Sequence, residues 1–211
     1  NLCQDTRCVF YNQSAWWREA NGFCLKRGAS VCHVAPQGAH CHAAYEGDVA
    51  PALMAYDAQA ELVGPQGSRR LPMAALYRDD GAAHLALGRG ELLVALHVPQ
   101  PAAGSASGWR KLRVRGAMDF ALAGVAVRLE RKGNVLGDLA VAISGTNSNP
   151  FRLDGTAALV GRAVDDAWLA ELGKLVGKQV SPMRSTVTAA HHRRQVAAVA
   201  AQRLVRELWT A

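Results

Sequence analysis

Four cysteines near the start of the chain could hold a metal centre. They are Cys8, Cys24, Cys32 and Cys41, separated by 15, 7 and 8 residues, and the chain beyond them contains no further cysteine. Thiolates are the soft ligands that iron–sulfur clusters and zinc require, and four of them complete either kind of site. The sequence therefore predicts a metal centre in the first fifth of the chain, with Cys3 as an unmatched fifth thiol.

The spacing of these cysteines favours an iron–sulfur cluster and leaves zinc open. Structural zinc sites usually take ligands in pairs two to four residues apart, and the four cysteines form no such pair. A mixed zinc site could still be completed by His33, His40 and His42. Structural disulfides are disfavoured, because an odd number of cysteines leaves one unpaired. We therefore expect a metal centre in a reducing cytoplasm.

The composition is that of a globular chain with a positive charge. Its 211 residues are 50% hydrophobic and 19% charged, and no apolar run approaches the length of a membrane span. The formal net charge is +7. Such a charge is compatible with an anionic cofactor, an acidic partner protein, nucleic acid or simply a solvated basic surface.

The sequence pattern of the first half of the chain changes after the cysteine segment, from irregular to periodic. Residues 1–45 show little periodicity and are expected to be irregular, shaped by whatever the cysteines bind. Residues 49–54 predict a short helix, with Asp48 as its candidate N-cap. Strands are predicted at 59–63 and 68–71, joined as a hairpin, and at 91–98.

The second half predicts strands followed by helices. A Pro-, Gly- and Ser-rich stretch at 99–108 is interpreted as a linker. Strands are expected at 109–115, 124–130 and 135–143, and amphipathic helices at 165–176 and 186–209. Strands grouped before helices are typical of an α+β fold.

Short motifs in the cysteine segment resemble one known family. They include Asn-Leu-Cys-Gln-Asp-Thr-Arg-Cys at 1–8, Asn-Gly-Phe-Cys-Leu-Lys at 21–26 and Val-Cys-His-Val-Ala-Pro at 31–36. The segment is similar to the flavin-carrying subunits of the xanthine oxidase family, and within it to the β subunits of the 4-hydroxybenzoyl-CoA reductases. An insertion that holds an additional 4Fe-4S cluster distinguishes that branch. The resemblance implies that the four cluster ligands here are Cys8, Cys24, Cys32 and Cys41.

The resemblance extends to residues that would contact FAD. Gly-Asp-Val-Ala-Pro at 47–51 is similar to a family stretch whose acid contacts FAD, which implies this role for Asp48. By the same resemblance, Leu92 and Leu93 pack on the flavin ring, and Lys111 is a flavin-contacting lysine. Asn1 resembles the last residue of the family's phosphate-binding loop.

The same resemblance implies a division of the chain into two domains. Residues 1–100 would be the C-terminal part of a FAD-binding, PCMH-type domain, with the 4Fe-4S insertion at about 3–45. Residues 107–211 would be a CO dehydrogenase flavoprotein-like C-terminal domain, made of a three-stranded antiparallel sheet plus helices. The Gly-rich N-terminal half of the family's flavin domain has no counterpart here, so we expect a fragment.

The implied function is electron transfer, with no catalytic residue of its own. Electrons from ferredoxin would pass through the 4Fe-4S cluster and FAD to partner subunits. Those partners would be a large subunit with the molybdenum cofactor and a small subunit with 2Fe-2S clusters. The whole complex would reductively dehydroxylate 4-hydroxybenzoyl-CoA to benzoyl-CoA in anaerobic aromatic degradation, in the cytoplasm, with no nucleic acid or membrane partner.

Two alternatives remain open at this point. The chain could be the FAD subunit of another molybdenum hydroxylase of the xanthine oxidase family, because substrate identity would lie on a different subunit. It could also be a zinc-stabilised basic module that binds nucleic acid through a positive surface.

Overall fold

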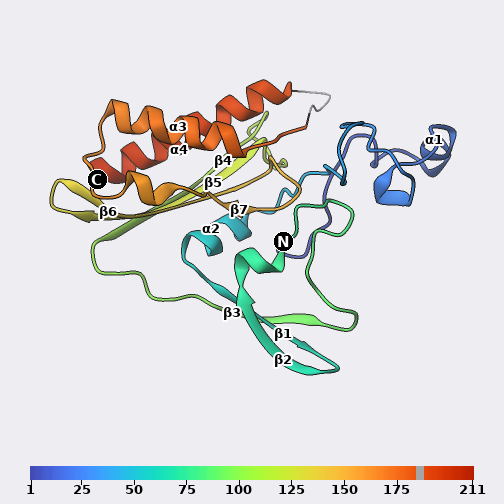
Figure 1. Cartoon of the computed structure of the whole chain (residues 1–211), viewed down its shortest axis with the longest axis horizontal. Coiled ribbons are helices and arrows are strands. Elements are labelled where there is room, and N and C mark those ends of the chain that lie inside the picture. Colours follow the sequence, from blue (N-terminus) through green and yellow to red (C-terminus); the bar gives the residue numbers. More distant parts are fainter. Residues whose placement is uncertain (184–187) are drawn as a thin grey trace.

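The structure is a computed structural model that describes residues 1–183 and 188–211. Figure 1 shows a body built on two antiparallel sheets, from which the cysteine-containing segment projects at one end. The smaller sheet has the strand order β2-β1-β3, and the larger has the order β4-β5-β6-β7. The N-terminus lies in the middle of the body, beside α2, rather than at an outer end.

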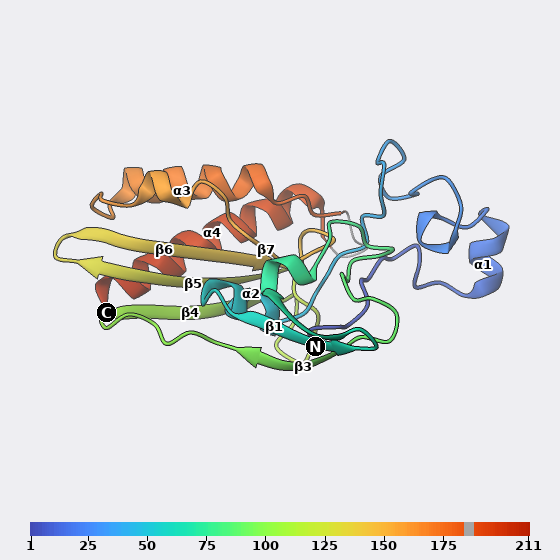
Figure 2. The ribbon, with the colours of Figure 1, turned by 60° about the horizontal axis from the view of Figure 1, so that its bottom comes forward.

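The cysteine segment is irregular, as predicted. It contains the short helix α1 (Ala15–Ala20) and one 3-10 turn (Leu25–Arg27). The Ser14 hydroxyl accepts a hydrogen bond from the Trp17 amide at 3.2 Å and caps α1. Every residue of α1 remains partly or fully exposed, and the helix lies at the far tip of the projection (Figure 2). The segment therefore gains little stability from packing against the body.

The small sheet confirms the predicted hairpin and third strand. Its strands are β1 (Gln59–Gly64), β2 (Gly67–Pro72) and β3 (Leu92–His97), with a 3-10 turn at Met73–Leu76 between the second and third. Gly67 has a φ of +107°, a conformation that favours glycine at the hairpin turn. The β1 and β3 strands pair antiparallel, which makes β3 an edge of this sheet.

Asp48 occupies the N-cap position of α2 (Val49–Ala55), as predicted, but its side chain makes no capping hydrogen bond. The Asp48 and Val49 amides both donate, at 2.9 Å, to the side-chain oxygen of Asn1, so the first residue of the chain caps this helix. The Asp48 carboxylate turns instead toward Lys111. Sequence proximity favoured Asp48, but a cap contributed from a distant residue satisfies the same amides.

The larger sheet has one strand more than predicted. Its strands are β4 (Ser105–Leu112), β5 (Ala123–Lys132), β6 (Val135–Ser144) and β7 (Phe151–Arg152). The strand β7 is too short for any periodicity to reveal it. The predicted linker at 99–108 is also too long, because β4 pairs with β5 from Ser105 onward.

Two helices cover one face of the larger sheet. They are α3 (Asp166–Gln179) and α4 (Ala190–Thr210), close to the predicted ranges, although positions 186 and 187 of the second prediction lie outside the described residues. The Asp165 carboxylate caps α3 by accepting from the Trp168 amide at 2.8 Å. Trp168 is fully buried in the core below the helices, and its indole N–H donates to the Leu159 carbonyl at 2.9 Å within the 3-10 turn Thr156–Leu159.

The opposite face of the larger sheet packs against α2. Figure 2 shows this sheet with α3 and α4 on one side and α2 on the other. The contact is made of alanines: Ala52 and Ala55 on α2 meet Ala126 on β5 and Ala140 on β6. Such small side chains allow a close approach of helix and sheet, so the half that contains the small sheet and the half that contains the larger sheet form one packed body.

An arginine fastens the end of α2 to this sheet. The Arg128 guanidinium donates to the Ala55 carbonyl at 2.7 Å and pairs with Asp138 at 2.9 Å and Asp57 at 3.3 Å. The charged contacts close the edge of the alanine interface. In the described part of the chain, no helix combines the length and apolar character needed to cross a membrane.

We predict that replacing Trp168 by alanine lowers the free energy of unfolding by roughly 3–5 kcal/mol, because a large cavity forms below α3 and the Leu159 carbonyl loses its donor. Trp16 is the matched control, since it is 75% exposed. Its replacement by alanine is expected to change stability by less than about 0.5 kcal/mol. Chemical denaturation of both variants measures the difference, and similar losses would contradict the described core.

Candidate functional site

The four predicted cluster ligands surround one pocket. Cys8, Cys24, Cys32 and Cys41 are all buried free thiols, and all four line the same small enclosed space. The rest of the wall is largely apolar, with Phe10, Tyr11, Leu25, Val34 and Ala43 among its residues. Cys3, by contrast, is exposed. The structure thus brings together the four cysteines that the sequence singled out and leaves the fifth outside.

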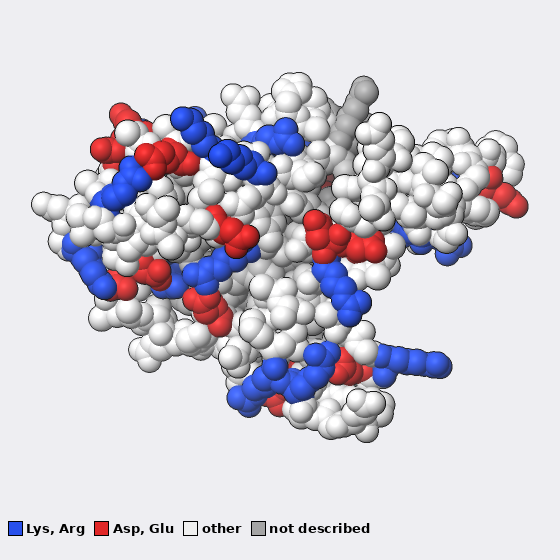
Figure 3. All heavy atoms as spheres, in the orientation of Figure 1, with Lys and Arg blue, Asp and Glu red and all other residues white. Residues whose placement is uncertain are grey.

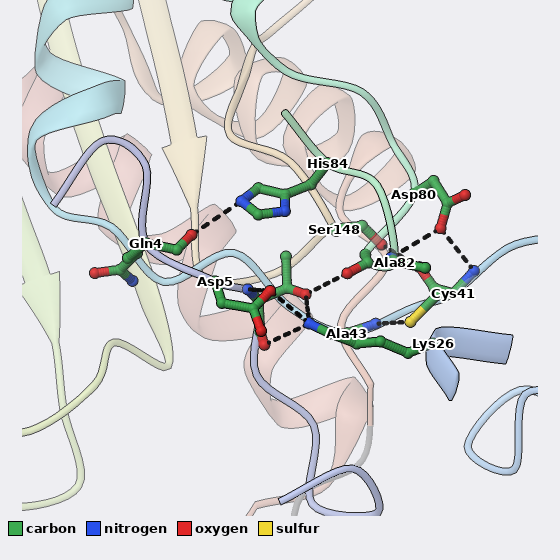
Figure 4. Close-up of polar contacts among 11 residues, drawn as sticks. Gln4, Asp5, Lys26, Cys41, Ala43, Asp80, Ala82, His84 and Ser148 are labelled. Atoms are coloured by element: carbon green, nitrogen blue, oxygen red, sulfur yellow. Dashed lines mark hydrogen bonds and ion pairs between the residues drawn. The ribbon is translucent and has the colours of Figure 1, made fainter. Parts of the chain in front are cut away.

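The body of the protein holds Cys41 directly. The Cys41 carbonyl accepts from the Ser148 hydroxyl at 2.9 Å, and its amide donates to the Asp80 carboxylate at 3.2 Å (Figure 4). The Ala43 amide points at the Cys41 sulfur at 3.5 Å. Paired backbone hydrogen bonds between Arg7 and Ala44, each 2.8 Å, bring the start of the cysteine segment alongside. Both ends of the segment are therefore fixed to the body.

Burial favours the protonated form of two of the thiols, Cys8 and Cys41. Desolvation raises the pKa of Cys8 and raises the pKa of Cys41 to about 11, while backbone amides and, for Cys41, the Lys26 ammonium act in the opposite direction. Lys26 is itself nearly buried and donates to the Thr6 hydroxyl at 2.5 Å and the Asp5 carboxylate at 2.7 Å. Thiols of this kind stay protonated at neutral pH until a metal displaces the protons.

The pocket does not have the form of a single-ion site. Within residues 1–183 and 188–211, no group of three or more His, Cys, Asp or Glu side chains is placed to hold one metal ion. Around one zinc ion, four thiolates would lie roughly 3.8 Å apart, given a Zn–S distance of about 2.3 Å. The histidines of a mixed site do not converge either: His33 bonds the Phe23 carbonyl at 2.5 Å, and His40 stacks on His42 with ring centroids 4.2 Å apart.

Three of the predicted flavin contacts form a second group at the start of α2. Asn1 caps the helix, and the Lys111 ammonium on β4 lies 2.7 Å from the Asp48 carboxylate. The other Asp48 oxygen, Oδ1, is buried and has no hydrogen-bond partner among the described residues. A buried acceptor of this kind is costly unless a donor satisfies it. The group therefore has the chemistry to receive a hydroxyl donor of a ligand.

The two predicted leucines lie on opposite faces of β3. Leu92 is 69% exposed and shares an apolar face with Val94 and Leu96, whereas Leu93 packs against the core of the small sheet. Leu92 is therefore free to contact a ligand or partner, and Leu93 has mainly a packing role.

Two buried tyrosines, which the sequence did not single out, position the N-terminus. The Tyr45 and Tyr77 hydroxyls lie 3.3 Å apart, and each donates to the Leu2 carbonyl at 3.1 Å. Burial raises the pKa of Tyr45 to about 12, so the hydroxyl remains a donor. These bonds fix the backbone next to Asn1 and hence its cap on α2. Nothing local in the sequence distinguishes these tyrosines, because their contacts are long-range.

Two family models match the chain. Residues 28–101 match the FAD binding domain in molybdopterin dehydrogenase, and residues 109–208 match the CO dehydrogenase flavoprotein C-terminal domain. These matches confirm the predicted α+β fold of a FAD-binding domain followed by this C-terminal domain.

The curated relatives have related functions. The chain is 33% identical to the aldehyde oxidoreductase FAD-binding subunit PaoB of Escherichia coli over 75% of this chain and 51% of that protein. It is 27% identical to the glyceraldehyde dehydrogenase medium chain of Sulfolobus acidocaldarius, over 81% and 60%. It is 30% identical to the carbon monoxide dehydrogenase medium chain of Afipia carboxidovorans, over 75% and 55%. The chain thus spans between about half and three fifths of the length of these relatives.

Solved structures agree with these relationships. The CO dehydrogenase from Oligotropha carboxidovorans superposes with a TM-score of 0.73 at 26% identity, over 77% of this chain and 56% of that chain. Quinoline 2-oxidoreductase from Pseudomonas putida 86 shares the fold, with a TM-score of 0.70 at 19% identity, over 86% and 65%. Together with the two family models, these similarities show that the chain belongs to the CO dehydrogenase/xanthine oxidase family of FAD-binding medium subunits.

Proposed function

We propose that this chain is an electron-transfer subunit of a molybdenum-containing oxidoreductase and that it holds one 4Fe-4S cluster beside FAD. The observation that carries the proposal is the convergence of four buried thiols on one pocket. Cluster irons in proteins are held by cysteine thiolates, and four such ligands complete a 4Fe-4S site. When bound, the cluster supplies one-electron transfer and FAD supplies exchange between one- and two-electron steps.

Two observations favour a cluster over zinc. A 4Fe-4S cluster spaces its ligands farther apart than one ion does, in keeping with thiols that line a pocket but form no single-ion group in the described residues. The apolar wall would keep water from the cluster, and the Ala43 amide near the Cys41 sulfur would stabilise a thiolate ligand. Residues 1–27, with Cys8 and Cys24, lie outside both matched family models, whereas residues 28–45, with Cys32 and Cys41, lie inside the FAD-binding match.

The flavin role rests on the group at the start of α2. In this proposal the partnerless Asp48 oxygen accepts from a hydroxyl of FAD, and Lys111 holds the carboxylate in position and supplies positive charge near an anionic cofactor. Asn1 fixes the end of α2, and Leu92 and Leu93 provide apolar surface and support for the flavin ring. We assign residues 1–100 to the flavin domain and residues 107–211 to the C-terminal domain.

The complex that we propose is of the 4-hydroxybenzoyl-CoA reductase type. A large subunit would carry the molybdenum cofactor and the substrate, a small subunit would carry 2Fe-2S clusters, and ferredoxin would donate electrons in the cytoplasm. The resemblance of the cysteine segment supports this assignment.

The relatives favour a second candidate, in which the chain serves another molybdenum hydroxylase. They are named as aldehyde, glyceraldehyde and carbon monoxide enzymes.

The charges on one face of the molecule, and the ion pairs among the described residues, give no support to the nucleic-acid alternative. On the face in Figure 3, Lys and Arg side chains are interspersed with Asp and Glu, without a continuous basic surface. Many charged side chains of the described residues form ion pairs, among them Arg69 with Glu91 at 2.6 Å and Arg162 with Glu171 at 2.6 Å. A phosphate backbone requires unpaired positive charge along a groove.

Replacement of Cys24 by serine is expected to abolish the cluster, because one of four ligands is lost. Protein purified without air should lose most of its iron, acid-labile sulfide and broad visible absorbance. Cys3 is the matched control, since it is exposed and outside the pocket. Cys3→Ser should retain about four irons and four sulfides per chain, as expected of a 4Fe-4S site. One zinc and no sulfide in the unaltered protein would reject the cluster.

Replacement of Lys111 by methionine is expected to weaken FAD binding about tenfold or more, equivalent to about 1.4 kcal/mol, because the Asp48 carboxylate loses its partner and the site loses a positive charge. Lys132 is the matched control, since its side chain is 66% exposed at a distant hairpin. Fluorescence titration of the assembled protein with FAD measures both affinities. Equal affinities for Lys111→Met and Lys132→Met would contradict the flavin assignment.

The substrate assignment is tested in the assembled complex with its partner subunits. With reduced ferredoxin, 4-hydroxybenzoyl-CoA should be converted to benzoyl-CoA, which chromatography detects. Oxidation of an aldehyde with no dehydroxylation of the thioester would select the second candidate instead.

A further inference from the structure

A second cavity lies directly beside the cysteine pocket. It has a volume of about 500 Å³ and lies between the N-terminal segment, the loop after β4 and the start of α4. Cys8 lines both this cavity and the cysteine pocket, so the two spaces share a wall. Glu46 also lines the cavity, two residues before Asp48. The cavity therefore connects the neighbourhood of the proposed cluster with that of the proposed flavin site.

Glu46 is a largely buried acid whose ion pairs are long. Its side chain is 13% exposed, and its carboxylate lies 3.5 Å from the Arg7 guanidinium and 3.9 Å from that of Arg193. Arg193 cannot close this distance freely, because its guanidinium already donates to the carbonyls of Leu122, Met183 and Gly145. Arg7 is held with its guanidinium 3.6 Å from the centre of the Phe120 ring. The carboxylate is thus only partly neutralised.

Charged groups from every neighbouring element face Glu46. They are Arg7 on the N-terminal segment, Lys111 on β4, Asp119 on the following loop and Arg193 on α4. Burial raises the pKa of Glu46 to about 7, with Asp119 acting in the same direction and the three cations acting against it. Glu46 can therefore exchange a proton near neutral pH, where ordinary glutamates remain ionised.

We propose that Glu46 takes up a proton when the redox centre beside Cys8 takes up an electron. The inference rests on the proposed function. The electron comes from the external reductant and stays on the centre; the proton comes from the bulk solvent through the cavity and converts the carboxylate to the acid. On reoxidation, one electron leaves for the next acceptor and the proton returns to water.

The coupling follows from electrostatics in a buried space. An added negative charge on the neighbouring centre raises the free energy of a carboxylate more than that of a carboxylic acid, so reduction favours protonation. Linkage makes the effect reciprocal: a protonated Glu46 makes reduction easier. The cavity would let water deliver the proton without opening the cysteine pocket.

The midpoint potential of the cluster should depend on pH if Glu46 is coupled to it. In an anaerobic spectroelectrochemical titration of the whole protein, we expect the potential to fall as pH rises from 6 to 8. In Glu46→Gln the potential should be constant with pH and remain near the low-pH value, because glutamine is always neutral. The control Glu19→Gln, an exposed acid on α1, should keep the slope. A flat profile in the unaltered protein, or an undiminished slope in Glu46→Gln, would overturn the inference.

A stability measurement tests the titration of Glu46 separately. Its pKa is about 7 in the folded protein and near 4.5 when unfolded, so the folded state binds the extra proton between these values and stability should fall as pH rises from about 4.5 to 7. Glu46→Gln should remove this fall, and Arg7→Gln should extend it to higher pH.

Absence of iron and sulfide would reject the proposed function, whereas an intact cluster without these pH effects would reject only the role of Glu46.

Discussion

The close contact between α2 and the larger sheet is the constraint on which the rest of the molecule depends. Alanines on both sides let the helix approach β5 and β6 closely, and Arg128 closes the edge of this interface. Because β5 is covered by α2 on one face and by the helical layer on the other, six of its ten residues are buried. A larger side chain in this layer would separate the two halves and move Lys111 away from Asp48. The position of the Asp48–Lys111 pair thus depends on small side chains that make no contact with a ligand themselves.

The cysteine segment is not held in place by an apolar core, unlike the rest of the molecule. It has almost no apolar core of its own, and helix α1 buries none of its residues completely. Its ends are held by the Arg7–Ala44 hydrogen bonds and by the contacts of Cys41 with Ser148 and Asp80, while the middle encloses a pocket lined by thiols. In such a segment, the free energy of metal binding supplies most of the free energy of folding. Contacts with the body fix the two ends of the segment, and the proposed cluster would order the residues between them.

Local patterns in the sequence predicted those elements whose determinants are local. The hairpin of β1 and β2, the strands β5 and β6 and the helix α3 follow from turn residues and hydrophobic periodicity. The strand β7 and the early start of β4 escaped prediction, because two residues carry no period and because pairing with β5 overrides the weak strand preference of Ser and Gly. The cap from Asn1 and the environment of Glu46 depend on contacts between distant residues, which no local pattern encodes. Four of the site residues, the cysteines, were found because thiols clustered in sequence are chemically unusual, and they do share one pocket.

The apolar face of β3 affects how this chain would behave when nothing covers that face. Leu92, Val94 and Leu96 on this edge strand, and Val98 just after it, are all exposed, a combination that favours pairing between copies of the same chain. Copies made in excess of whatever covers this face would be the first to aggregate or to be recognised by chaperones and proteases. Exposure of this strand would therefore mark the copies whose β3 is left uncovered, and aggregation or degradation would keep their number low.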